Sequence, residues 1–111
     1  MEKTEARLQA ECFQWHWNTY PNQRGLLFMV HNSPRNAIDG NRLKAQGMVA
    51  GVSDMICLRD NQPPLCIEIK LPTGKQQANQ IAWQQVAEST GAKYVVVRSL
   101  DEFQDVIESC R

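Results

Sequence analysis

The chain has 111 residues, with 12 basic and 12 acidic side chains and 42% hydrophobic residues. A chain of this length buries roughly two-thirds of its surface on folding, which suffices for one core and leaves no room for a second catalytic domain. The formal net charge of zero counts modestly against a protein that binds nucleic acid by charge alone. This objection weakens if several acids share a metal site, because the cation then offsets them and leaves Lys and Arg to face phosphates.

The four cysteines form no C-x-x-C pair and no zinc-finger spacing, so we expect reduced thiols that behave as small buried hydrophobes. No apolar signal segment precedes the first charged residues. The longest apolar run is far shorter than the roughly 20 residues that span a bilayer. These observations predict a cytoplasmic protein that does not associate with a membrane.

The first predicted element is a helix over 4–20, which ends before Pro21. Its core-facing stripe recurs at helical spacing and comprises Leu8, Glu11, Cys12, Trp15 and Thr19. The short apolar run from Leu26 to Val30 predicts a buried strand, and the polar stretch over 32–40 predicts a long loop. A short helix is expected over 42–46, where Gly47 would end it.

Two apolar runs, 55–58 and 65–71, flank the turn-rich stretch 59–64 and predict an antiparallel hairpin. Helix formers dominate over 76–90, and a β-branched strand is predicted over 94–97. Ser99 and Glu102 form a capping box for a last helix, whose apolar positions follow helical spacing and are Phe103, Val106, Ile107 and Cys110.

The predicted order is therefore α-β-(α)-β-β-α-β-α. One hairpin followed by a helix that crosses to a fourth strand indicates an α/β fold, with a mixed four-stranded sheet flanked by helices. We expect residues 1–111 to form a single domain.

Glu68 and Lys70 form an E-x-K tripeptide within the second strand of the hairpin. Strand alternation sends both side chains to one face of the sheet. An isolated E-x-K is most often a cross-strand or solvated ion pair, so the tripeptide alone decides nothing.

Asp54, which lies just before the first hairpin strand, adds a second carboxylate near the Glu68 and Lys70 pair. Pairing the hairpin about its turn centre places Asp54 near Lys70 and diagonal to Glu68, at the roughly 7–8 Å typical of diagonal neighbours. Carboxylates at that separation can converge on one divalent cation. The alternative is that Asp54 is a turn residue that caps a nearby backbone N–H.

Two predicted helices add one candidate each. Glu11 falls on the stripe expected to face the core, where a carboxylate needs a cation or hydrogen-bond donors to offset its desolvation. A salt bridge at the edge of the stripe is the alternative. Gln80 lies in the first turns of the second long helix and is either a site residue or a solvated helix residue.

Asp54 and Glu68-Ile69-Lys70, preceded by a helix that carries Glu11, resemble the PD-(D/E)xK nuclease core, with Ser53 where a proline is most common. The wider pattern resembles the VRR-NUC (virus-type replication-repair nuclease) branch of that superfamily, including its stand-alone phage and bacterial members. Its elements are His31-Asn32, Gly47 with Gly51-Val52-Ser53-Asp54, Glu68-Ile69-Lys70, Thr73-Gly74 and Gln80 with Trp83. The resemblance covers nearly the whole chain and implies a restriction-endonuclease-like core.

The resemblance also implies divalent-metal-dependent hydrolysis of phosphodiester bonds in structured DNA, with four-way (Holliday) junction cleavage by a homodimer in stand-alone members. Asp54, Glu68 and the Ile69 backbone carbonyl would hold Mg²⁺ or Mn²⁺, with Glu11 at a second ion or acting through a water. Lys70 would orient the attacking water and offset developing charge, and Gln80 would complete the catalytic set. A phage-encoded or bacterial protein of the cell interior, close to the nucleoid and without an organic cofactor, is expected.

DNA contacts are expected from residues that flank this site. His31 and Asn32 end the first strand near the same sheet edge and are candidates for contact with the scissile phosphate; a structural, hydrogen-bonded His is the alternative. Four basic residues are candidates for backbone phosphates, with a solvated charged loop as the alternative: they are Arg35, Arg42, Lys44 and Lys75. A dimer contact is expected around Trp17 and the helix of Phe103.

Two other functions compete with the nuclease. One is a catalytically silent nuclease fold that serves as a DNA-binding or assembly module, against which the presence of all three acids and the lysine argues. The other is a small α/β protein that binds another protein and carries E-x-K as a structural ion pair.

Overall fold

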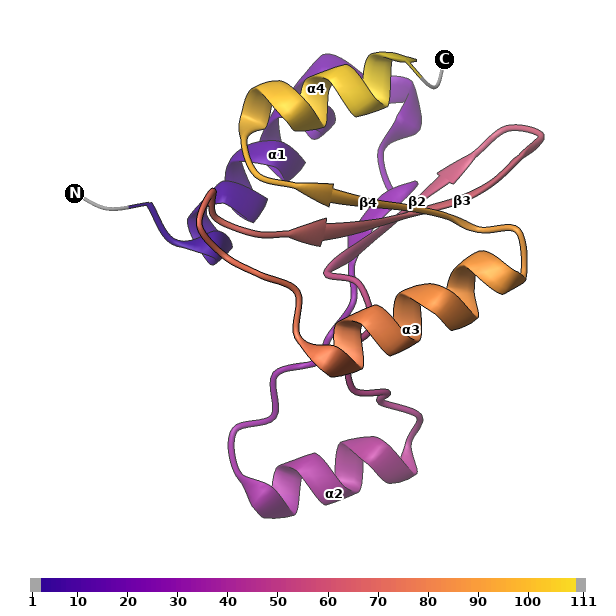
Figure 1. The fold of residues 1–111 in the computed structure, drawn as a ribbon. Coiled ribbons are helices and arrows are strands. Elements are labelled where there is room, and N and C mark those ends of the chain that lie inside the picture. Colours follow the sequence, from indigo (N-terminus) through magenta and orange to yellow (C-terminus); the bar gives the residue numbers. More distant parts are fainter. Residues whose placement is uncertain (1–2, 110–111) are drawn as a thin grey trace.

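A mixed sheet of four strands forms the centre of the fold, with helices on both of its faces (Figure 1). The computed structural model describes residues 3–109. In spatial order the strands are β1 (Leu27–Met29), β2 (Met55–Arg59), β3 (Gln62–Ile69) and β4 (Lys93–Val97). The first three pair antiparallel, whereas β4 runs parallel to β3 because a helix connects them. The predicted fold class is therefore confirmed.

The first helix, α1 (Glu5–Thr19), confirms the helix predicted over 4–20. Thr4 caps it, because its side-chain oxygen accepts a hydrogen bond from the backbone N–H of Arg7 at 3.1 Å. A short 3-10 turn, η1 (Pro21–Gln23), follows the helix. The buried residues of α1 lie at four-residue spacing, and they are Leu8, Cys12 and His16.

A second helix, α2 (Ala37–Ala45), begins within the predicted loop over 32–40 and is longer than the helix predicted over 42–46, whereas residues 32–36 are loop as expected. It begins early because Asn36 Oδ1 accepts a hydrogen bond from the backbone N–H of Asp39 at 2.8 Å. The helix buries Asp39 and a glycine rather than an apolar stripe, so hydrophobic periodicity does not reveal it. In Figure 1, α2 stands away from the sheet and is joined to it by two extended segments.

The hairpin between β2 and β3 is longer and tighter than predicted. β3 begins at Gln62, inside the stretch expected to be a turn, and the reversal is made at Asn61, whose φ of 55° lies in the left-handed region. Pro63 and Pro64 are tolerated within β3 because β4 pairs with it only from Leu65 onward, so this end of β3 is a sheet edge.

The two remaining helices match their predictions. α3 (Ala78–Ser89) ends ahead of Gly91, whose φ is 94°. α4 (Leu100–Ser109) is capped as expected, because the hydroxyl of Ser99 accepts a hydrogen bond from the backbone N–H of Glu102 at 3.1 Å. Among the expected apolar positions of α4, Phe103 and Ile107 are buried, Val106 is half-buried, and Cys110 lies outside the described residues.

The main core lies between the sheet and the pair α1 and α4, while α3 packs on the opposite face (Figure 1). Its largest buried members come from α1, all four strands and α4, and they include Leu8, Leu27, Met55, Ile67, Val97 and Phe103. No helix within residues 3–109 is both long enough and apolar enough to cross a membrane.

Candidate active site

Asp54 and Glu68 lie opposite each other at the end of the hairpin. Met55 of β2 pairs with Ile67 of β3, so extending that register by one residue sets Asp54 across from Glu68. The predicted diagonal relation, with Asp54 nearer to Lys70, is therefore wrong, because the tight turn and a bulge after Cys57 shift the register. The two carboxylates are closer neighbours than the sequence suggested.

Backbone contacts fix the position of Asp54. Its Oδ2 atom accepts a hydrogen bond from the backbone N–H of Ile69 at 2.6 Å, and its carbonyl accepts one from the backbone N–H of Val30 at 2.9 Å. Burial raises the pKa of the Asp54 carboxyl, and the nearby carboxylates of Glu68 and Glu5 raise it further. The Ile69 hydrogen bond and the Lys70 charge act in the opposite direction without cancelling this rise.

Glu68 is 1% exposed, and its two carboxylate oxygens have different surroundings. Oε1 accepts hydrogen bonds from the Tyr94 hydroxyl and from Gln76 Nε2, the latter at 3.0 Å. Oε2 is buried without a hydrogen-bond partner, and Lys70 Nζ lies 4.0 Å from it. Because Lys70 is itself 6% exposed, a carboxylate and an ammonium are both buried here without a direct hydrogen bond between them.

This donor set fits one divalent cation. A buried carboxylate oxygen without a partner, beside a second carboxylate whose pKa is raised, would be stabilised by a cation that accepts oxygen ligands. Asp54, Glu68 and the Ile69 carbonyl are the oxygens available from the hairpin. Within residues 3–109, no three His, Cys, Asp or Glu side chains are gathered closely enough to form a metal site by themselves.

Glu11 is not on the core-facing stripe of α1, so this placement was wrong. Its side chain is 34% exposed and forms ion pairs with Lys3 at 2.7 Å and with Arg7 at 4.0 Å. The buried spacing of Leu8 and Cys12 leaves Glu11 at the flank of the helix. The salt bridge at the stripe edge, the alternative reading of the sequence, is what forms.

Glu5 is the acid of α1 that lies near the site, and the sequence reading missed it. Its charge contributes to the raised pKa of Asp54. A Cβ placed on Gly74 would lie 3.6 Å from Glu5 Oε2 and 3.5 Å from Lys70 Cδ, so both side chains border that glycine. Glu5 and Glu11 lie three residues before and after the buried Leu8, on opposite flanks of its stripe, so helical spacing alone does not favour Glu5.

Arg98 holds the segment that follows the E-x-K strand. Its Nη1 atom donates hydrogen bonds to the carbonyls of Leu71 and Gly74 at 2.9 and 2.6 Å, and to that of Pro72 at 3.4 Å. These bonds fix the P-T-G turn beside Lys70, although Arg98 was not among the predicted site residues.

Gln80 caps α3 rather than contacting the carboxylates. Its Oε1 atom accepts a hydrogen bond from the backbone N–H of Gln77 at 2.8 Å. The glutamine that reaches Glu68 is Gln76, which precedes the helix and which the sequence did not single out.

Ser53 is fully buried before Asp54, and its hydroxyl donates a hydrogen bond to the carbonyl of Met55 at 3.2 Å. Ser53 also hydrogen-bonds to Cys66, a contact that partly offsets the rise that burial causes in the pKa of that thiol. Serine thus fixes the entry into β2 through a side-chain bond where a proline would restrict the backbone.

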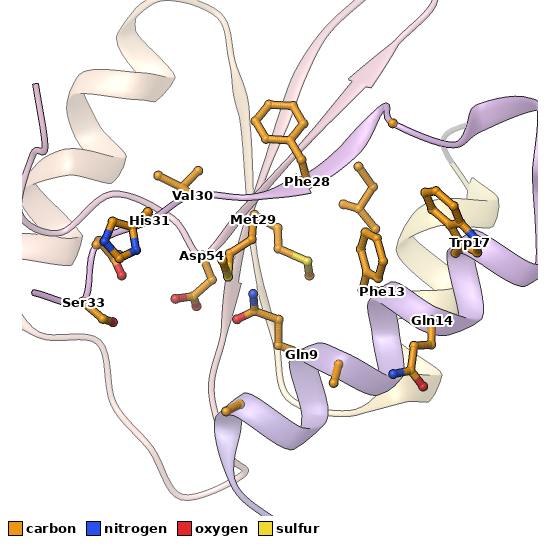
Figure 2. A pocket seen from close by; sticks show the side chains of 16 residues that line it. Gln9, Phe13, Gln14, Trp17, Phe28, Met29, Val30, His31, Ser33 and Asp54 are labelled. Atoms are coloured by element: carbon orange, nitrogen blue, oxygen red, sulfur yellow. The ribbon is translucent and has the colours of Figure 1, made fainter. Parts of the chain in front are cut away.

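A groove of about 780 Å³ runs between α1 and β1 and ends at Asp54 (Figure 2). His31 lies at the Asp54 end, and Phe13 and Trp17 line the far end. His31 is exposed, whereas Asn32 is half-buried and its Nδ2 atom donates a hydrogen bond to the carbonyl of Val52 at 3.3 Å. The structure therefore places both residues beside Asp54, and Asn32 connects the segment that enters α2 with the segment that leaves it.

Two of the four predicted phosphate-binding residues converge on Asp39. Arg42 Nη2 lies 2.7 Å from Asp39 Oδ1, and Arg35 Nε lies 3.8 Å from Oδ2. The backbone N–H of Arg35 and the guanidinium of Arg42 lower the pKa of Asp39, despite its low exposure. Both arginine side chains remain mostly exposed, at 83% and 59%, and Lys44 and Lys75 are exposed as well.

A mixed sheet that brings two acids and a lysine together at the end of a hairpin is the arrangement of a PD-(D/E)xK nuclease core. The chain belongs to the VRR-NUC family, whose domain model matches residues 3–101. It is therefore a domain with nuclease-type function on DNA. A solved structure of a VRR_NUC domain protein is similar in fold, with a TM-score of 0.76 and 24% identity over 98% of this chain and 88% of that one. No curated protein matches the sequence.

Proposed function

We propose that the protein is a divalent-metal-dependent endonuclease that hydrolyses phosphodiester bonds in structured DNA, with four-way junctions as its preferred substrate. One observation carries this proposal: Glu68 buries an unpartnered carboxylate oxygen across from Asp54, with the ammonium of Lys70 4.0 Å away. A purely structural ion pair would close to hydrogen-bond distance, whereas this arrangement leaves an oxygen available for a ligand.

Each residue of the site would have a separate role in hydrolysis. Asp54, Glu68 and the Ile69 carbonyl would hold Mg²⁺ or Mn²⁺, which when bound polarises the scissile phosphate as a Lewis acid. Lys70, held in place by burial, would orient the attacking water and offset the negative charge that develops at phosphorus. Glu5 would replace Glu11 as the acid from α1, because Glu5 is the one whose charge reaches Asp54.

The position of α2 supports a role in binding DNA. The segment that enters α2 follows β1 and passes His31, and the segment that leaves α2 ends at Asp54, so both connections of the helix lie next to site residues. In Figure 1, α2 lies apart from the rest of the fold at the end of these two segments. The single negative charge of Asp39 offsets only one of its two arginine partners. The group of Arg35, Asp39 and Arg42 therefore presents a net positive charge to solvent. Arg35 and Arg42, with Lys44 and Lys75, would bind backbone phosphates and so position the DNA.

A twofold homodimer would supply the two sites that a junction requires. Phe103, which was expected at the contact, is fully buried in the core and is not available. The groove between α1 and β1 is the better surface, since β1 is an edge strand and Trp17, Phe28 and Met29 are 41%, 40% and 64% exposed along it. Sedimentation velocity at micromolar concentration should give a dimer that Met29→Glu dissociates, while Ile38→Glu, an equally apolar exposed position on α2, leaves it intact.

The activity is tested on a panel of single strands, duplexes, flaps and four-way junctions with Mg²⁺ or Mn²⁺. We expect the wild type to cut the junction, and Asp54→Asn, Glu68→Gln and Lys70→Ala to bind it without cutting. Glu11→Gln is the matched control, since this acid lies in a surface ion pair. Cleavage that persists in Asp54→Asn or Glu68→Gln would refute the site, and binding without cleavage by the wild type would leave a DNA-binding module instead.

A further inference from the structure

The surroundings of Glu68 contain two donors that the proposed mechanism has not used. Tyr94 lies on β4, and its hydroxyl donates to Glu68 Oε1 from the strand parallel to β3. Gln76 lies in the segment before α3 and donates to the same oxygen at 3.0 Å. Two separate elements therefore converge on one oxygen of one buried carboxylate.

Each donor is held in place by a neighbour of its own. Gln76 Nε2 also donates to Gln84 Oε1 on α3 at 2.9 Å, which anchors the amide between the helix and the strand. The Tyr94 ring packs beside Trp83 of α3, with ring centroids 6.1 Å apart. The donors are thus fixed by packing and hydrogen bonding, and they do not depend on Glu68 for their positions.

Two donors on Oε1 have a consequence for Oε2. The terminal torsion of a glutamate is soft, so an unrestrained carboxylate rotates and exchanges its oxygens. With Oε1 filled by Tyr94 and Gln76, Oε2 is held as the oxygen without a partner, on the side where Lys70 lies 4.0 Å away.

We propose that Tyr94 and Gln76 are positioning residues, which fix the Glu68 carboxylate so that Oε2 is presented to a divalent cation. This inference rests on the proposed metal-dependent function and adds residues to it that touch neither the cation nor DNA. Hydrogen-bond partners of metal-binding side chains typically change metal affinity by about 10- to 100-fold when they are removed.

The test is a calorimetric titration of Mn²⁺ into the full chain, with Tyr94→Phe and Gln76→Ala compared with the wild type. Tyr94→Phe removes only the hydroxyl and keeps the ring beside Trp83. Tyr20→Phe and Gln85→Ala are matched controls, because Tyr20 packs against Trp15 and Gln85 is exposed on α3. Circular dichroism and thermal melting establish that each variant is folded.

We expect Tyr94→Phe and Gln76→Ala each to weaken Mn²⁺ binding by about 10-fold or more, and both controls to bind as the wild type does. In cleavage assays at limiting Mn²⁺, the two variants should lower kcat and leave the KM for DNA unchanged, and higher Mn²⁺ should restore kcat. If either variant fails to fold, the other decides the question, because each removes one donor from the same oxygen.

The failure of this inference is distinguishable from the failure of the proposed function. If the wild type binds Mn²⁺, Asp54→Asn does not, and both positioning variants bind like the wild type, this inference alone is overturned. If the wild type takes up no Mn²⁺, the metal-dependent function is overturned and this inference with it.

Discussion

Replacing Asp54 with asparagine should raise the melting temperature of the metal-free protein. Side chains directly opposite each other on antiparallel strands have Cβ atoms about 5 Å apart, and two unit charges at that distance repel by roughly 3 kcal/mol at an effective dielectric of 20. The attraction of Lys70, the bond from the Ile69 N–H and the partial exposure of Asp54 reduce this value. A net gain of about 1 kcal/mol remains, which corresponds to a rise of about 4–8 °C for a domain of this size.

Mn²⁺ should reverse the order of the two melting temperatures, so that the wild type melts above Asp54→Asn. A cation present at 100 times its Kd stabilises the wild type by about 2.7 kcal/mol, whereas Asp54→Asn lacks the charged ligand and should gain little. Differential scanning fluorimetry in EDTA and across a Mn²⁺ series should therefore show melting temperatures that cross as metal is added. A variant that melts below the wild type in EDTA, or that responds equally to Mn²⁺, would contradict the assignment of Asp54 as a ligand beside Glu68.

Four further predictions use other features. Lys70→Met should lower kcat by at least about 100-fold without weakening Mn²⁺ binding, measured by single-turnover cleavage and calorimetry. Burial raises the pKa of the Cys12 thiol to about 11, so peptide mapping after iodoacetamide treatment at about pH 8 should find it unmodified. The pKa of Asp39 is lower in the folded than in the unfolded state, so its contribution to stability is present above its ordinary value and is lost as the pH falls through the folded value. Urea unfolding of Asp39→Asn should accordingly lack that acid-range loss, and Arg42→Ala should bind DNA more weakly with a smaller dependence on salt.

The order of elements could be predicted because most of them bury an apolar pattern. The run around Ile67 and the spacing of Phe103 and Ile107 are signals that survive without tertiary information, since each is driven by local geometry and burial. The helix α2 carries no such pattern, and its start depends on the cap at Asn36. A polar helix held by its cap and by Asp39 with two arginines cannot be distinguished from a polar loop by periodicity.

The residue types of the candidate site could be predicted from the sequence, but the register of the two strands that carry them could not. Asp54 and the E-x-K strand follow from the hairpin, yet their exact pairing depends on a reversal at Asn61 and on a bulge, which together shift the strands. The donors Gln76 and Tyr94 lie 8 and 26 residues from Glu68 along the chain. The segment before α3 brings Gln76 to Glu68, and the crossover through α3 brings Tyr94 on β4. Such contacts have no local signature.

Which acid of α1 lies near the site depends on the face of the helix that is turned toward the hairpin. Glu5 and Glu11 are both acids of one helix, but Glu5 borders Gly74 together with Lys70, whereas Glu11 pairs with Lys3 at 2.7 Å. Glu5→Gln should therefore slow cleavage by at least about 10-fold at limiting Mn²⁺, because it removes a charge that favours cation binding beside Asp54. Glu11→Gln should leave kcat unchanged and lower stability by no more than about 1 kcal/mol, the usual contribution of an exposed ion pair. Parallel single-turnover assays and urea melts of the two variants test this assignment. The reverse pattern, with cleavage lost in Glu11→Gln and retained in Glu5→Gln, would show that Glu11 is the acid of the site, as the sequence alone suggested.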